Sequence, residues 1–424
     1  MPELEELETF LKKAEKKVDQ AELYFERQNS TSMMTKLDGI DIGKSNLNRG
    51  YSIRVVNDGR LGFSYFSSPS EFDKALKNAI HSAKFSKKLG VSFPSRKKLS
   101  EAKGIHNKRV LDLSEEEMSD MLLQMIDLIK RKKVKPLNGS VFKSEKFRMM
   151  INSEGGSFQN KDTRFGVSAG ALFKESKGHE WFSSHNLFGI DRIAENAASN
   201  AIKFSGGKPA SGNFDIILHP ELVSNLISQI FLQAINGERV FRKDSFFYGK
   251  LGKKVAPNKI TVYDDPLLPQ GLNSYPCDDE GVPSTKRPII EKGILKSFLY
   301  NLEISHLTKK KSTGNGFRQS FHGPPFTEIT NLVIDSKDKV KLEEFKGILV
   351  HNLLAIHNAN TLTGDFALEI QSGAFFDGEI KKPIGSCSLV GNFFDILKNV
   401  KMGDDFQNYD FYYGPSWIYH GKVV

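Results

Sequence analysis

Residues 2–18 follow a helical pattern of apolar and charged positions. Leucine, alanine and valine recur every three or four residues, with glutamates in the first turn and lysines in the last. The chain then changes to short β-branched and aromatic runs separated by Asp-Gly turns, which predicts strands at 33–37, 51–56 and 61–66. The chain is therefore expected to open with a helix followed by hairpins.

Capping signals mark two further helices. Ser70 followed by Asp73 predicts the start of one helix, and Ser114 followed by Glu117 forms a capping box that opens a helix over 115–132. A connector rich in lysine and serine separates the two.

One of these segments recurs along the chain. The pattern of Asp, Asn, Ala, Lys, Phe and Ser in 73–86 returns in 191–205. Each copy follows a glycine-containing hairpin region, and the second region, 149–185, has turns predicted at 154–156 and 177–178. We interpret this as an internal duplication, with a chance match between two short helices as the alternative.

The predicted fold class is α+β throughout. Residues 1–205 are expected to form an α+β domain of two related hairpin-plus-helix units, in which helices cover one face of antiparallel sheets. Residues 206–212, rich in glycine and serine, predict a flexible linker. Residues 213–424 begin with a strand and a helix over 221–236. Many strand signals follow, which predict a β-rich sandwich or barrel-like domain.

Composition narrows the possible classes of protein. The chain has 424 residues, 39% of them hydrophobic and 26% charged, which is typical of an ordinary globular protein. Its two cysteines, Cys277 and Cys387, exclude a disulfide framework and a paired-cysteine zinc site. Apolar runs fall far short of the ~20 residues that a membrane span needs, and the N-terminus is acidic, so a cytoplasmic protein is expected.

The net charge of +9 makes nucleic acid a candidate partner. The lysines are scattered in short groups, without a recognition-helix pattern or alternation with aromatic residues. Nucleic-acid binding is therefore the weaker interpretation.

Histidine spacing gives no obvious metal site. His179 and His185 lie six residues apart in a predicted strand, which would separate them by roughly 20 Å. His351 and His357 have the same spacing and meet the same objection. The acidic run at 278–280 is best interpreted as turn-forming, because it does not have the ligand spacing of an EF-hand loop.

Residues 312–318 (Ser-Thr-Gly-Asn-Gly-Phe-Arg) form a glycine-spaced loop whose amides could hold a carboxylate or a phosphate. The loop has no Gly-Lys-Ser/Thr ending, so a nucleotide-binding P-loop is not expected. A Gly-x-Ser-x-Gly elbow is also absent from the sequence, and no catalytic nucleophile is predicted.

Taken together and in order, the glycine and acid motifs resemble the TldD/PmbA (TldE) family, described as modulators of DNA gyrase and understood as intracellular metallopeptidases. The resemblance covers nearly the whole chain. The matching segments are 50–62, 264–266, 278–283, 291–295, 312–318, 363–366, 391–392 and 403–405.

The family contains two kinds of subunit, and the resemblance assigns this chain to the PmbA/TldE kind. The TldD kind carries His-Glu-x-x-x-His on the first helix of its C-terminal domain and a cysteine near the C-terminus. Here Ser228, Gln229 and Gln233 take the motif positions, and residues 406–424 contain no cysteine. Serine and glutamine are poor zinc ligands, so no metal, other cofactor or catalytic residue is expected in this chain. His219 lies about two turns too early and is expected at the helix entry.

The resemblance implies a TldD-like partner that carries zinc, in a heterodimer, or else a homodimer. The complex would enclose a chamber in which unfolded peptides are hydrolysed, and this chain would hold extended peptide as an added strand. The candidate chamber residues are Ser312, Thr313, Asn315, Arg318, Thr363, Gly364 and Asp365.

Two alternatives remain open at this point. One is a nucleic-acid-binding regulator, as the gyrase description suggests. The other is a self-sufficient homodimeric peptidase with a different cation site, built from Asp278, Asp279 and Glu280.

Overall fold

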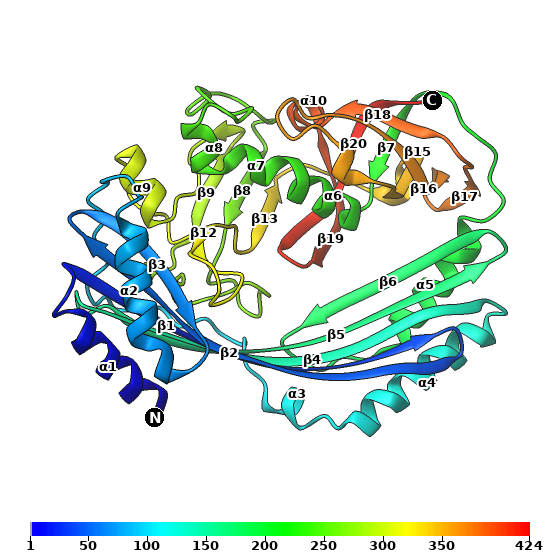
Figure 1. The fold of residues 1–424 in the computed structure, drawn as a ribbon. Coiled ribbons are helices and arrows are strands. Elements are labelled where there is room, and N and C mark those ends of the chain that lie inside the picture. Colours follow the sequence, from blue (N-terminus) through cyan, green and yellow to red (C-terminus); the bar gives the residue numbers. More distant parts are fainter. Residues whose placement is uncertain (1) are drawn as a thin grey trace.

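The computed structural model describes residues 2–424, which form a mixed α+β structure with one six-stranded and one twelve-stranded sheet and a separate two-stranded pair. The six-stranded sheet is a long, bent layer, and the C-terminal half lies over one side of it (Figure 1). No helix within residues 2–424 is long and apolar enough to cross a membrane.

The elements of the N-terminal half are α1 (Pro2–Ala14), β1 (Gln20–Lys36), β2 (Gly39–Asn57), β3 (Arg60–Phe66), η1 (Pro69–Glu71), α2 (Phe72–Ala83), α3 (Lys108–Asp112), α4 (Glu115–Arg131), β4 (Lys135–Asn152), β5 (Ser157–Phe173), β6 (Ser176–Ser184) and α5 (Asp191–Lys203).

The six strands are antiparallel and follow the order β3-β2-β1-β4-β5-β6, so two three-stranded units meet at the β1–β4 pair. The same close helix approach occurs at both edges. A Cβ atom added to Gly62 of β3 would lie 2.0 Å from the carbonyl oxygen of Ala79 in α2, and one added to Gly178 of β6 would lie 2.0 Å from that of Ala197 in α5. The recurring sequence segment therefore has a recurring structural environment.

Each three-stranded unit has its own cluster of buried hydrophobic side chains. Beneath α1 and α2, Phe10 and Phe72 stack with ring centroids 4.4 Å apart, in a cluster that includes Leu7 and Leu76. A second cluster lies beneath α4 and α5, and it includes several alanines of α5. The small alanine side chains let α5 approach the sheet closely.

The predicted capping box of α4 is present, with the Glu117 amide donating to the Ser114 hydroxyl. Other predicted boundaries differ from the observed ones. The turn predicted at 177–178 is wrong, because the chain turns before β6, where Lys174 has φ = 55°. Gly178 lies within the strand, where it makes room for α5. The strands β1 and β2 extend to 17 and 19 residues, well beyond their predicted hydrophobic portions.

The elements of the C-terminal half are β7 (Gly212–Leu218), α6 (Pro220–Leu226), the π-helical turn η2 (Ile227–Phe231), α7 (Leu232–Ile235), α8 (Gly237–Phe241), β8 (Ile260–Asp264), β9 (Arg287–Glu291), β10 (Ile294–Leu295), α9 (Leu302–Thr308), β11 (Gly316–Phe317), β12 (Phe326–Thr327), β13 (Leu332–Ser336), β14 (Lys339–Val340), η3 (Leu342–Glu344), β15 (Lys346–Leu353), η4 (Ile356–Asn358), β16 (Asp365–Asp377), β17 (Ile380–Pro383), β18 (Ser388–Asn392), α10 (Phe393–Asn399), β19 (Lys401–Tyr409) and β20 (Tyr412–Val423).

Five of these strands close into a barrel. They follow the order β20-β18-β16-β15-β7, and β7 also pairs with β20, where Leu218 lies opposite Trp417. Ring closure removes the exposed strand edges that an open sheet would leave. The segment 206–212 is attached to this half, since the Lys208 carbonyl accepts a hydrogen bond of 2.8 Å from the Gly385 amide.

A buried network of charges joins the two halves. Arg54 of β2 donates to Glu22 of β1 at 2.8 Å and to Glu280 of the C-terminal half at 2.6 Å, and Arg318 donates to Glu22 at 2.6 Å. These side chains are at most 2% exposed. Ions so deeply buried need partners, so the network fixes how the barrel half sits on the long sheet.

Candidate functional site

The π-helical turn η2 follows α6, and it places two of the predicted positions on one cavity. In a regular α-helix, residues five apart lie about 140° apart around the axis, whereas a π turn brings them close to alignment. Ser228 of η2 and Gln233 of α7 both line a cavity of about 230 Å³, together with Thr327 and Glu328. The helix thus presents positions 228 and 233 to the same space.

The two amide side chains on this helix bond to different neighbours, Gln229 to the loop that contains η4 and Gln233 to α8. Gln229 donates to the carbonyl oxygen of His357 at 3.4 Å. Gln233 accepts from Arg239 at 3.2 Å, and Arg239 also donates to the hydroxyl of Thr361. Hydroxyl and amide side chains thus occupy the positions to which the family resemblance assigns His, Glu and His.

The loop 312–318 contributes no lining residue to this cavity but is hydrogen-bonded to a segment that lines it. The hydroxyl groups of Ser312 and Thr313 donate to the carbonyl oxygen of Tyr300. Asn315 is fully buried and donates to Asp264 at 2.7 Å and to the carbonyl oxygen of Glu328 at 2.9 Å. Asn315 therefore supports the backbone of Glu328, which lines the cavity, and direct contact of these three side chains with a peptide remains a prediction.

Arg318 and the acidic run 278–280 belong to the buried charge network. Asp278 accepts from the backbone amides of Gly316 and Val282, and Asp279 accepts from Arg148 and from the Arg318 amide. Burial and the neighbouring Glu280 raise the pKa of Asp278 well above its usual value.

Glu280 pairs with Arg54 and accepts from the Leu302 amide. The three carboxylates of 278–280 thus point to different protein donors. Across residues 2–424 they do not form a group that could hold a metal, which corrects the alternative cation site.

Thr363, Gly364 and Asp365 lie elsewhere, in the turn before and at the start of β16. Thr363 donates to Asp365 at 2.6 Å, and Asn392 donates to Asp365 at 2.7 Å and to the Thr363 carbonyl. Gly364 has φ = 85° and fits against the ring of Phe394. The site predicted from the sequence therefore separates into three places: the small cavity with the neighbouring loop 312–318, the buried network, and this turn.

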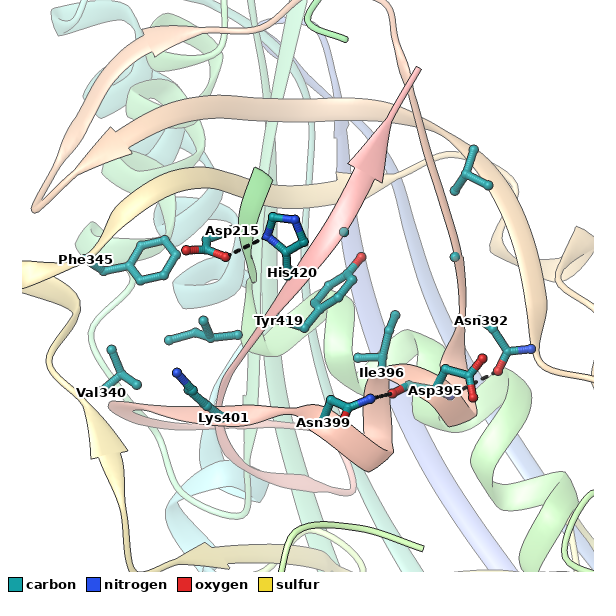
Figure 2. A pocket seen from close by; sticks show the side chains of 14 residues that line it. Asp215, Val340, Phe345, Asn392, Asp395, Ile396, Asn399, Lys401, Tyr419 and His420 are labelled. Carbon is teal, nitrogen blue, oxygen red and sulfur yellow. Dashed lines mark hydrogen bonds and ion pairs between the residues drawn. The ribbon is translucent and has the colours of Figure 1, made fainter. Parts of the chain in front are cut away.

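Asn392 borders a larger cavity of about 630 Å³ between β7, β20 and α10 (Figure 2). Asp215 and His420 face each other there at 3.0 Å, and Lys401 and Tyr419 also belong to the polar lining. The cavity is apart from the 228–233 helix, because none of its lining residues comes from that segment.

His219, Glu221 and His351 form a cluster that the sequence does not predict. One nitrogen of each imidazole and one carboxylate oxygen all lie within 4.8 Å of one another. Parallel pairing of β7 with β15 brings the histidines together, because the His219 amide donates to the Val350 carbonyl at 3.0 Å. The two rings stack with centroids 4.2 Å apart.

Electrostatics in this cluster favour neutral groups. Burial lowers the pKa of His351 to about 4 and that of His219 well below its usual value. Burial raises the pKa of Glu221 to about 7, although a 2.7 Å hydrogen bond from the Trp181 indole opposes the rise. His219 also caps α6, as predicted, since its Nδ1 accepts from the Glu221 amide at 3.3 Å. At neutral pH both imidazoles are thus in the form that binds metal.

Comparison with protein families covers both halves of the chain. Models of the PmbA/TldA metallopeptidases match residues 21–83 (domain 1), 108–204 (central domain) and 211–423 (C-terminal domain). Together with the antiparallel sheet and the closed barrel, these matches define a protein of the metallopeptidase-like class. The chain belongs to the PmbA/TldD family.

Individual relatives extend over almost the full length. A protein of Methanocaldococcus jannaschii described as uncharacterized is 29% identical and covers 99% of this chain and 100% of its own length. A metalloprotease of Methanothermobacter thermautotrophicus is 25% identical, over 95% of this chain and 91% of its own. The crystal structure of TldE from Thermococcus kodakarensis superposes with a TM-score of 0.91 at 24% identity, covering 99% and 100% of the two chains.

Proposed function

We propose that this chain is a TldE-like subunit of a cytoplasmic peptidase complex, which shapes a chamber for unfolded peptides and does not itself supply the family's metal. The observation that carries the proposal is the 228–233 helix. The π turn directs positions 228 and 233 to one cavity, yet serine and glutamine stand there. This geometry suits a pair of metal ligands, whereas these side chains are poor ligands for zinc.

A complete peptidase would then need a second subunit. A TldD-like partner would supply zinc, which polarises the peptide carbonyl and activates water. Family membership and the TldE-type fold support this division of roles. A homodimer of this chain alone would lack the family's metal motif in both copies.

Reconstitution tests the proposal. The purified chain, a zinc-loaded TldD-like subunit, and their mixture are incubated with an unfolded, fluorescently labelled polypeptide. We expect cleavage by the mixture and none by this chain alone. The matched control is a mixture whose TldD-like subunit has both metal-motif histidines replaced by alanine, and it should be inactive. Chelator-sensitive cleavage by this chain alone would overturn the proposal.

A further inference from the structure

We infer that His219, Glu221 and His351 form a binding site for a divalent transition-metal ion of the zinc class. Two imidazoles and one carboxylate are a donor set that zinc uses in proteins, and three protein ligands leave a fourth position for water or another side chain. Within residues 2–424, this is the group whose ligand atoms come close enough to share an ion.

The ligand atoms need to move only a little to close on an ion. Bonds of 2.0–2.1 Å in a tetrahedral site place ligand atoms about 3.4 Å from one another. Those of His219, Glu221 and His351 already lie within 4.8 Å. A neutral imidazole has one acceptor nitrogen, so an ion bound at Nδ1 of His219 would replace its long contact to the Glu221 amide.

Rigid elements hold the three residues in place. His219 follows β7, Glu221 lies in the first turn of α6, and His351 lies on β15 of the barrel. The indole of Trp181 donates to Glu221 at 2.7 Å and fixes one carboxylate oxygen. Hydrogen bonds from surrounding residues to metal ligands orient those ligands and raise the affinity for the metal. Because Trp181 belongs to β6, an ion here would also strengthen the contact between the long sheet and the barrel.

Two cavities give an ion and water access to the cluster. Glu221, His351 and His179 line one of about 270 Å³, and His219 and His351 line another of about 550 Å³ with Trp181. His179 is therefore available on the same surface as a further imidazole.

This site is separate from the family's metal motif. The cavity of Ser228 and Gln233 shares no lining residue with either of these two cavities. The inference therefore stands independently of the proposed function, and a metal in this cluster would be compatible with a chain that cleaves no peptide.

Metal titration of the full-length, untagged chain tests the inference. The protein is stripped with a chelator, dialysed, and titrated with Zn²⁺ by calorimetry and with Co²⁺ by visible absorption. We expect one equivalent to bind and the Co²⁺ spectrum to be that of a four-coordinate site. His351→Gln and Glu221→Gln should each weaken Zn²⁺ binding by at least about tenfold. His81→Gln, which changes an exposed histidine of α2, is the matched control and should bind as the wild type does.

Trp181→Phe is a second test of the metal site, and it leaves all three ligands in place. It removes the indole donor to Glu221, and we expect it to weaken Zn²⁺ binding by about 10- to 100-fold. Absence of stoichiometric binding in the wild type would overturn the inference. Equal binding by wild type, His351→Gln and Glu221→Gln would overturn it as well. Peptide cleavage by the metal-loaded chain alone would overturn the proposed function and leave the metal site supported.

Discussion

Arg54 and Glu280 form a buried ion pair of 2.6 Å although 226 residues separate them in the sequence. Arg54 lies on the long sheet and Glu280 on a loop of the C-terminal half, so the pair crosses the junction between the two. Arg54 also pairs with Glu22, which Arg318 holds from the other side. The junction therefore depends on charges that have no access to water.

We expect Arg54→Leu to lower the free energy of unfolding by about 3–5 kcal/mol, because it leaves buried carboxylates without their partner. Urea denaturation followed by circular dichroism measures the change. Lys341→Leu is the matched control, since it breaks an exposed pair with Glu344 and should have little effect. Similar small changes in both variants would contradict the role of the buried pair.

The pKa of Glu22 predicts how the stabilisation by this buried network depends on pH. Burial opposes its charge, yet Arg54 and Arg318 hold the pKa of Glu22 below its usual value of 4.5. A carboxyl whose pKa is lower in the folded chain stabilises it above the unfolded pKa and loses this effect as pH falls through the folded pKa. The difference in unfolding free energy between wild type and Glu22→Gln should thus be greatest near neutral pH and shrink below pH 4.5.

Urea denaturation of wild type and Glu22→Gln, each at neutral and at acidic pH, measures this difference. A gap that stays constant or widens on acidification would show that the charge of Glu22 is not the stabilising feature.

The two glycines against the helices predict matched steric effects. Gly62→Ala and Gly178→Ala each place a methyl group 2.0 Å from a helix carbonyl oxygen. We expect each to destabilise the chain by about 1–3 kcal/mol, because the helix must shift. Gly189→Ala is the control, since an added Cβ there meets no atom within 4 Å. Thermal unfolding measures the loss of stability in the three variants. An equal loss in Gly189→Ala would refute the steric explanation.

The π turn predicts that a metal site can be installed on the 228–233 helix. In a His351→Gln background, Ser228→His with Gln233→His should bind Zn²⁺ at least about tenfold more tightly than either single change, because both imidazoles face one cavity. The control is Ser228→His with Arg242→His, which adds the same number of histidines. Arg242 is exposed at the C-terminal end of α8, so its replacement does not add a second imidazole to the cavity. Equal affinities measured by calorimetry would mean that positions 228 and 233 do not face each other.

Local sequence signals predicted local structure well. The Ser114–Glu117 box starts α4 as expected, because capping uses residues only three positions apart. The turn predicted at Gly178 is wrong, because glycine serves both in turns and where a helix packs closely. The partner that distinguishes these uses, Ala197, lies on another element.

The His219 cluster shows why much of the site could not be predicted. The spacing of His351 from His357 predicts no metal site, because the partner of His351 in the cluster is His219, 132 positions earlier in the chain. The pairing of β7 with β15 creates that proximity, and no local spacing reports it. Likewise, Arg318 is a predicted chamber residue, and the structure places its buried side chain within the charge network that joins the two halves.

The closed barrel also determines the order in which the two sheets can form during translation. Strand β7 emerges first among its members and β20 last, yet these two are neighbours in the ring. The six-stranded sheet uses only strands between residues 20 and 184, so its pairings can form while the ribosome is still translating the second half. The barrel, by contrast, cannot close until almost the final residue is made. β7 can pair with β15 before then, but the edge of β7 that pairs with β20 stays open throughout that interval.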